Sequence, residues 1–312
     1  MDTAENSPSV SVFQPRLLLV DDDPAMIRII GEMLAECPDQ RFATTGEAAL
    51  ALARESTPDL ILLDANLPTM TGFDVCEILK HDAKLSRVPV IFVTSHDAPA
   101  LEVDAFNMGA SDYVIKPLVA ARLQARVRAQ LRLTDRALHM RARSHDADAQ
   151  ASASAGTGVR LLGILGNDTA LAQRDALEAF GALDVVTDRE AALNLIARDE
   201  PDAIVLDSRC SNAPGETQAL EQTVRALLAP NLLVPLIVLA DACDAETERR
   251  ILDAGAADVI AKPAKPAVLQ ARVRAALAST RRAREALRAA LEASAGANVH
   301  PFPVYVRDPR GM

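Results

Sequence analysis

The chain has 312 residues, 49% of them hydrophobic, which suggests about two domains of ordinary size and argues against general disorder. Its formal net charge of -10 argues against nonspecific nucleic-acid affinity for the whole molecule, which leaves only local basic patches. The start is not signal-like and no apolar run reaches about 18 residues, so we expect a cytoplasmic protein without a membrane segment.

The first predicted strand ends in a cluster of acids. We expect residues 1–15 to be disordered and residues 16–20 to form a buried strand, after which come Asp21, Asp22 and Asp23. Pro24 suits the first turn of a helix. Three neighbouring carboxylates repel one another, so the cluster favours a shared cation. Asp23 could instead be the N-cap of that helix, and the sequence leaves both roles open.

Further short apolar runs alternate with helical patterns in the first half. The continuous aliphatic run at 60–63 is typical of a parallel sheet that helices cover on both faces. Five βα units follow, and ligands of such sheets bind beyond the carboxyl ends of the strands. The other predicted strands are 41–44, 90–93 and 113–115, and the helices are 47–55, 73–81, 98–108 with Gly109 as C-cap, and a long one from Leu118.

An internal repeat predicts a second domain of the same kind. Residues 121–131 recur at 267–277, and 109–117 recur at 255–263, both with an offset of 146. Residues 144–158, rich in Ala, Ser, Asp and Gly, should form a flexible linker. We therefore expect domains at 16–143 and 159–293, each with an extended last helix, and an extended tail at 294–312.

The first copy resembles the receiver domain of two-component response regulators over about 16–133. Four motifs carry the resemblance: Leu-Val-Asp-Asp-Asp at 19–23, Leu-Leu-Asp-Ala-Asn-Leu-Pro-Thr-Met-Thr-Gly at 62–72, Val-Thr-Ser at 93–95 and Lys-Pro at 116–117. The resemblance implies an α/β fold of two doubly wound (βα)5 flavodoxin-like domains, each with a five-stranded parallel sheet.

The resemblance also implies the roles of single residues. Asp64 would accept phosphate from a sensor histidine kinase or a histidine phosphotransfer protein. Asp21, Asp22, Asp64 and the backbone carbonyl of Asn66 would hold Mg²⁺, which prefers oxygen ligands. The remaining expectations are that Lys116 and the Thr94 hydroxyl contact the phosphoryl oxygens, that Tyr113 switches from an exposed to a buried rotamer, and that a cis peptide precedes Pro117.

Plainer interpretations stay open for several of these residues. Gly72 could be a simple turn glycine. Asn66 and His96 could be ordinary polar loop residues, although the resemblance places them where dephosphorylation is tuned. Tyr113 could be a half-buried strand aromatic.

The second copy is predicted to be a degenerate receiver. Aligning 161–165 with 16–20 places Gly166, Asn167 and Asp168 opposite the three acids. Asp207 and Lys262 remain. The hydroxyl and the aromatic are missing, because Ala240 and Val259 stand at their positions. A strand register that is wrong by one residue would leave Asp168 as a fallback ligand.

Both last helices, 118–143 and 265–292, are rich in arginine. Residues 273, 277, 280, 287 and 291 follow alternating spacings of four and three, with Arg284 at the intervening position. This pattern favours a short coiled coil or a helix pair, and a solvated basic face is the alternative. We expect a homodimer through these helices or through the face formed by 98–133, with a downstream effector protein as a further partner.

No motif of an output enzyme appears, so the chain is expected to be a phosphoacceptor signalling protein and not an enzyme. It resembles the regulatory half of receiver-receiver diguanylate cyclases, and control of a separate or missing cyclase is an alternative function. DNA binding through the basic helices is less favoured, since no aromatics interleave the arginines. A dinucleotide-binding enzyme is disfavoured because the first βα turn lacks the glycine fingerprint.

Overall fold

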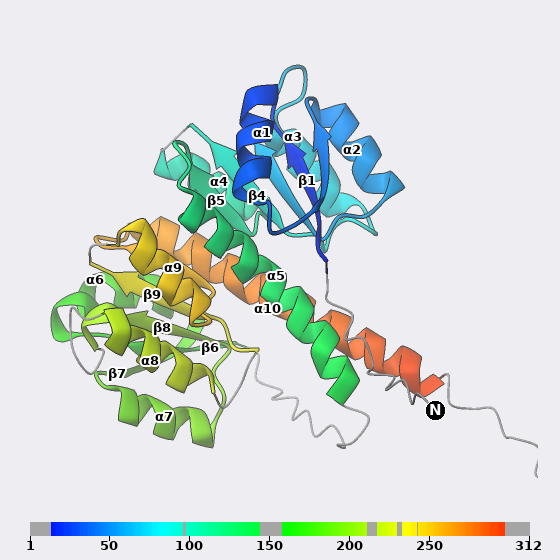
Figure 1. Cartoon of the computed structure of the whole chain (residues 1–312). Helices are drawn as coiled ribbons and strands as arrows, with labels where there is room; N and C mark the ends of the chain where they lie inside the picture. The colour runs from blue at the N-terminus through cyan, green and yellow to red at the C-terminus, as the bar shows by residue number, and fades with distance from the viewer. Residues whose placement is uncertain are drawn as a thin grey trace, which may run out of the picture.

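The computed structural model describes residues 14–95, 98–143, 158–210, 217–229, 233–241 and 243–296. Most of the predicted N-terminal segment, linker and tail lies outside the described residues, as does His96. The described chain forms two five-stranded parallel sheets, one in each half, with helices around them (Figure 1). This confirms the predicted fold class of two α/β domains.

The first sheet has the strand order β2-β1-β3-β4-β5. Its second strand begins two residues earlier than the sequence predicts, because Asp39 and Gln40 pair with Arg16 and Leu17 of β1. This strand lies at the edge of the sheet, where polar residues stay in contact with water and weaken the apolar signal. The strands are β1 (Arg16–Val20), β2 (Asp39–Ala43), β3 (Leu60–Asp64), β4 (Val90–Thr94) and β5 (Asp112–Ile115).

The helices of the first domain lie close to their predicted positions. Side chains cap three of them, since Asp23, Thr45 and Thr71 accept hydrogen bonds from the first turns of α1, α2 and α3. Gly109 lies just beyond α4 with φ of 95°, a left-handed conformation that suits glycine and confirms the predicted helix end. The helices are α1 (Pro24–Met33), α2 (Gly46–Glu55), α3 (Gly72–His81), α4 (Pro99–Asn107) and α5 (Ala120–Arg143).

Alternate residues of the central strands build the core on the two faces of the sheet. Leu18 and Leu63 belong to the apolar cluster on one face, and Leu17 and Leu62 belong to the cluster on the other. All four are buried, as a sheet covered by helices on both sides requires.

The second domain repeats this architecture, with the strand order β10-β9-β8-β6-β7. Its strands are β6 (Val159–Ile164), β7 (Gly181–Val186), β8 (Ala203–Asp207), β9 (Leu236–Ala240) and β10 (Asp258–Ala261). Its helices are α6 (Asn167–Glu178), α7 (Arg189–Arg198), the 3₁₀ turn η1 (Ser208–Cys210), α8 (Thr217–Leu228), α9 (Ala245–Asp253) and α10 (Pro266–Gly296).

The predicted alignment of the two first strands is wrong by one residue. Val20 pairs with Leu63, and its counterpart Ile164 pairs with Leu206. Leu165, Gly166 and Asn167 therefore correspond to Asp21, Asp22 and Asp23. The sequence misleads because the aliphatic run continues one residue beyond β6. The corrected register places Asp168 opposite Pro24, beyond the three acids. A role for Asp168 as a fallback metal ligand is therefore not supported.

The last helices of the two domains pack against each other within the chain. Figure 1 shows α5 and α10 side by side between the two sheets, and α5 also contacts α9 while α10 contacts α4. The expected helix pair is thus confirmed. Its seam differs from the predicted coiled coil, because Val273 packs in the core of its own domain and Leu277 lies against that core. The side chains of residues 287 and 291 lie outside the described residues.

The face formed by α4, β5 and α5, which we expected to meet partners, is covered by the second domain. Ala271 and Ala275 of α10 belong to an apolar cluster of the first domain, and Ala125 and Ala129 of α5 belong to a cluster of the second. Arg126 on this face is buried and paired with Asp112 and Glu248, so it is not part of a solvated basic surface. Within the described residues, no helix has both the length and the apolar character needed to cross a membrane.

Candidate functional site

Three carboxylates meet at the carboxyl edge of the first sheet. Asp21 follows β1 and Asp64 ends β3, and these two strands are neighbours in the sheet. One carboxylate oxygen from each of Asp21, Asp22 and Asp64 lies within 4.8 Å of the others. Among the residues that the structure describes, this is the single group of three or more acidic, histidine or cysteine ligands with such spacing. The structure therefore brings together the three acids that the sequence predicted as metal ligands.

Lys116, just beyond β5, supplies a cation to this acidic group. Its Nζ lies 2.8 Å from Asp21 Oδ2 and 3.4 Å from Asp64 Oδ2. Burial lowers the pKa of Lys116, but the hydrogen bond and the charge of Asp21 outweigh that effect, so the pKa is raised. One ammonium offsets one of three carboxylates, which leaves the group with excess negative charge when all are ionised.

Asp64 is buried and keeps one carboxylate oxygen without a hydrogen-bond partner in the described part of the chain. It is 6% exposed, and its Oδ1 atom is buried with no hydrogen-bond partner among the described residues. Burial raises the pKa of Asp64, Lys116 opposes this shift and the charge of Asp21 reinforces it. A buried carboxylate oxygen without a donor is costly unless something binds it. The three carboxylates therefore form a set of oxygen ligands that fits a hard cation.

Asp23 has a structural role. Its Oδ1 accepts a hydrogen bond of 2.8 Å from the Ala25 amide and caps α1, and its own amide donates to Asp21 Oδ1 at 3.0 Å. Of the two roles that the sequence left open, the N-cap is the one that these contacts support. The second contact fixes one oxygen of Asp21, while Asp22 is exposed at the mouth of the group.

Gly72 supports the backbone beneath the site, a role that sequence reasoning missed. Its amide donates to Ala65 O at 2.9 Å, and a Cβ atom at this position would stand 2.0 Å from Asp64 O. The close approach of the Asp64 carbonyl, and not a left-handed backbone conformation, explains why position 72 is a glycine. The sequence offered one indication of this role, since Gly72 stands at the start of the helix that follows β3. Asn66, two residues after Asp64, is exposed.

Thr94 lies on β4, the neighbour of Asp64's strand β3, and Tyr113 lies on β5, the strand beyond β4. Thr94 ends β4, is fully buried and pairs with Ile115. Tyr113 is 3% exposed, and its ring centroid lies 6.5 Å from that of Phe92. The ring thus occupies a buried position in this structure. The predicted cis peptide between Lys116 and Pro117 is present, and Lys262–Pro263 has one as well.

The corresponding edge of the second sheet has different chemistry. Asp207 is fully buried, and Lys262 Nζ lies 2.6 Å from its Oδ1 atom. Arg209, two residues after Asp207 as Asn66 is after Asp64, donates two hydrogen bonds of 2.9 and 2.7 Å to Asp241. Lys262 also lies 3.2 Å from Asp241. Among the described residues, two cations therefore stand on the second edge where the first has one. Neither Arg209 nor Asp241 was predicted from the sequence.

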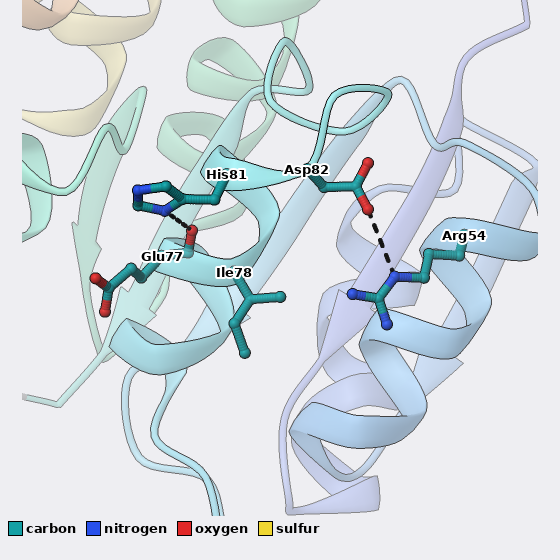
Figure 2. Close-up of a pocket in the computed structure, with 5 residues that line it drawn as sticks. All are labelled: Arg54, Glu77, Ile78, His81 and Asp82. Carbon is teal, nitrogen blue, oxygen red and sulfur yellow. Dashed lines mark hydrogen bonds and ion pairs between the residues drawn. The ribbon is translucent and has the colours of Figure 1, made fainter.

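A separate depression on the first domain is lined by Arg54, Glu77, Ile78, His81 and Asp82 (Figure 2). Arg54 Nε lies 3.5 Å from Asp82 Oδ2, and His81 Nδ1 lies 2.8 Å from Glu77 O. It is open to solvent at the carboxyl ends of α2 and α3. Because the helices run against the strands, this end is opposite to the acidic group, and the depression adds nothing to the site.

Comparison with known proteins agrees with this geometry. Residues 17–128 match the family described as response regulator receiver domain. The chain is 31% identical over 271 residues to the response regulator PleD of Caulobacter vibrioides, across 83% of this chain and 58% of PleD. It is 40% identical over 123 residues to RpaA of Synechocystis, a DNA-binding dual master transcriptional regulator, across 39% of this chain and 51% of RpaA.

Among solved structures, the signal receiver domain of a LuxO repressor protein from Vibrio parahaemolyticus is 32% identical, with a TM-score of 0.37, over 38% of this chain and 92% of that domain. The chain spans between half and three fifths of the length of PleD and RpaA. Its first half matches the response regulator receiver domain, and the chain as a whole is similar to response regulators of two-component signalling.

Proposed function

We propose that the first domain is a phosphorylation switch in a cytoplasmic two-component phosphorelay, with Asp64 as the phosphoacceptor. The observation that carries this proposal is the buried, unpartnered Oδ1 of Asp64 beside Asp21, Asp22 and Lys116. A carboxylate that accepts a hydrogen bond from one ammonium and still has one oxygen without a donor is suited to accept an electrophilic phosphoryl group.

The residues around Asp64 suit Mg²⁺. Asp21, Asp22 and Asp64 would hold it, with the backbone carbonyl of Asn66 as a further ligand, because Mg²⁺ takes a few carboxylates and keeps several waters. When bound, the ion would neutralise charge on the phosphoryl oxygens during transfer. Asp23 supports this set by holding one oxygen of Asp21.

The chain's own groups would perform the rest of the transfer. The Asp64 carboxylate attacks the phosphorus of a phosphohistidine on a sensor kinase or phosphotransfer protein, and the P–N bond breaks as the O–P bond forms. Lys116 would move its ammonium from Asp21 toward a phosphoryl oxygen, and the Thr94 hydroxyl would donate to another. Tyr113, on the strand β5 that Lys116 follows, would carry the change to the face formed by α4, β5 and α5.

We propose that the second domain keeps the fold but has lost this chemistry. Asp207 has Lys262 at 2.6 Å, and Leu165 and Gly166 replace two of the acids. Ala240 and Val259 replace the hydroxyl and the aromatic. A phosphoryl group on Asp207 would have no bound metal ion beside it. No hydroxyl or aromatic side chain would be present to change position in response to it.

The partners follow from this switch. The donor would be a histidine kinase or phosphotransfer protein, and the altered face would regulate dimerisation or an effector protein. Because PleD is longer than this chain, control of a cyclase output elsewhere stays a second proposal. DNA binding through the basic helices is less supported, since Arg126 and Arg272 are engaged by acids of the same chain.

Beryllofluoride binding tests the proposal. Calorimetry with Mg²⁺ should give one site per chain that Asp64→Asn abolishes. The matched variant Asp207→Asn removes the same charge from the second domain and should leave the affinity within about twofold. Equal losses in both variants, or binding that survives Asp64→Asn, would contradict the assignment.

A further inference from the structure

Two cations from different domains lie at the amino edge of the first sheet, the end opposite to the acidic group. Lys80 comes from α3, and its Nζ atom lies 2.7 Å from Val88 O and 3.5 Å from Ser86 O, shortly before β4. Arg282 comes from α10, and its Nη2 atom lies 3.4 Å from Ser111 Oγ, directly before β5. The second domain thus brings an arginine to the place where the first domain holds a lysine.

The two charges act on each other. Burial and the charge of Arg282 together lower the pKa of Lys80 to about 8. Burial also lowers the pKa of Arg282, and the charge of Arg281 adds to that shift. The Cys76 thiol lies near both cations, but burial raises its pKa to about 11, so it supplies no negative charge at neutral pH. Two poorly solvated charges of the same sign therefore oppose each other here.

Among the described residues, no acid compensates these charges by an ion pair. Lys80 donates to backbone carbonyls, and Arg282 donates to the hydroxyls of Ser111 and Ser279 at 3.4 and 3.0 Å. Glu285, one turn along α10, is more than half exposed and lies 3.8 Å from the arginine that precedes Arg282. An enclosed charge without a partner of opposite sign is unfavourable. The cluster therefore carries a positive charge that the contacts of the described chain do not neutralise.

Two other enclosed arginines show how this chain neutralises such charges elsewhere. Arg126 binds Glu248 of the other domain at 2.6 Å, and Arg272 binds Glu102 of the other domain at 2.6 Å. Arg282 lies on the same helix as Arg272, yet its described hydrogen bonds go to neutral hydroxyls. The missing acid at this position is the feature that calls for a ligand.

The free hydrogen-bond donors of the cluster suit an oxyanion. In the described contacts Arg282 uses its Nη2 group, which leaves the Nε and Nη1 groups to bind two oxygens of one anion in a fork. The Lys80 ammonium adds a point charge with three donors. The Ser111 and Ser279 hydroxyls can rotate to donate as well. Donors that come from several directions fit a tetrahedral anion better than a flat one.

We infer that Lys80, Arg282, Ser111 and Ser279 form a binding site for a small tetrahedral oxyanion such as inorganic phosphate. The anion would neutralise two cations that repel each other, and it would join α3 of the first domain to α10 of the second. The site lies at the opposite end of the sheet from the acidic group. The inference therefore does not depend on the proposed phosphorylation of the first domain.

Sulfate binding to the full chain tests the inference, because sulfate keeps its double charge at neutral and alkaline pH. Calorimetry in a chloride buffer of constant ionic strength should give one site per chain. Arg282→Gln should weaken the affinity by about tenfold or more, since it removes a charged fork of donors. Arg274→Gln is the matched control on the same helix. It removes an exposed charge, which salt screens, and should change the affinity by less than about twofold.

The pH dependence of sulfate binding gives a second signature. The affinity of the wild type should fall about tenfold from pH 7 to pH 9, because the Lys80 ammonium loses its proton with a pKa of about 8. Cys76 stays neutral over this range, while Arg281, Arg282 and Glu285 keep their charges. Lys80→Met should bind sulfate weakly at pH 7 and should lose the pH dependence. A purely structural role of Lys80 would not produce this change.

The competing outcomes are distinct. Inorganic phosphate should displace sulfate at pH 7, and Asp64→Asn should bind sulfate as the wild type does. Arg282→Gln and the pH dependence of the wild type decide the matter if Lys80→Met fails to fold. Saturable binding that is absent in the wild type, that survives Arg282→Gln unchanged or that phosphate does not displace would overturn the inference.

Discussion

The ammonium group of Lys116 is bound to Asp21, with Nζ 2.8 Å from Oδ2, and lies farther from Asp64, at 3.4 Å. Lys116→Met should therefore leave two enclosed carboxylates facing each other without that cation. We expect the free energy of unfolding in EDTA to fall by about 3 kcal/mol, the usual cost of breaking a buried ion pair. Saturating Mg²⁺ should recover most of this loss, as urea titrations with and without the ion would measure.

Lys262→Met is the matched control for this prediction. It removes the corresponding ammonium, which lies 2.6 Å from Asp207. The second edge has no group of three acids among the described residues, so Mg²⁺ should not restore stability there. Equal recovery by Mg²⁺ in the two variants would show that the acidic group of the first domain does not hold the ion.

Substitutions of Asp22 and Asp23 should affect different properties, the first the Mg²⁺ affinity and the second the stability. Asp22 is exposed at the acidic group, so Asp22→Ala should weaken Mg²⁺ affinity at least tenfold and leave the melting temperature unchanged without metal. Asp23 caps α1, so Asp23→Ala should cost about 1 kcal/mol of stability and change the affinity less. Calorimetry measures the Mg²⁺ affinity and thermal melts measure the stability. The opposite pattern would mean that Asp22 caps the helix and Asp23 binds the metal.

Gly72→Ala should damage the site through the backbone. The new Cβ would stand 2.0 Å from Asp64 O, so the strand end or the start of α3 must move. We expect a loss of about 2 kcal/mol of stability, in the range of overpacked cores, together with weaker Mg²⁺ binding. Gly158→Ala is the control, because nothing lies within 4 Å of its Cβ position. If the two variants behave alike, the close contact is not what requires glycine.

Lys80 should make stability depend on pH in the alkaline range. Burial lowers the pKa of Lys80 to about 8 from 10.5, and the nearby charge of Arg282 lowers it further, although its Nζ donates to Val88 O at 2.7 Å. Below pH 8 the ammonium is present in both the folded and the unfolded chain, so its burial opposes folding. Between about pH 8 and 10.5 only the unfolded chain keeps the proton, and stability should rise as the pH increases.

The difference in unfolding free energy between the wild type and Lys80→Met isolates this effect. It should shift in favour of the wild type by up to about 3 kcal/mol from pH 8 to 10.5, from 1.36 kcal/mol per pKa unit. Chemical denaturation at several pH values measures it. A difference that stays flat across this range would mean that Lys80 titrates normally.

The sequence predicted the central strands and the acidic group because their signals are local. A continuous aliphatic run such as Leu60–Asp64 needs no partner to be recognised as a buried strand, and carboxylates at strand ends must meet at one edge of a parallel sheet. The edge strand β2 was placed two residues late, since Asp39 and Gln40 are polar and only their pairing identifies them.

The remaining misses depend on contacts between distant residues. Leu165 looks like part of β6, and only its pairing in the sheet places it opposite Asp21. The sequence left a solvated basic face open as one of two alternatives for the last helices, because the partners Glu248 and Glu102 of their arginines lie more than 100 positions away in the sequence. The requirement for glycine at position 72 can be recognised only once Asp64 O is known to lie beside it.

Mapping the phosphoryl group after reaction with acetyl phosphate and Mg²⁺ tests the central claim most directly. Borohydride reduction marks the modified aspartate, and peptide mass spectrometry then locates it. We predict one acid-labile phosphoryl group per chain, on Asp64, and its loss when EDTA replaces Mg²⁺. Labelling of Asp207 to the same extent, or labelling of Asp64 that does not need the metal, would contradict the account.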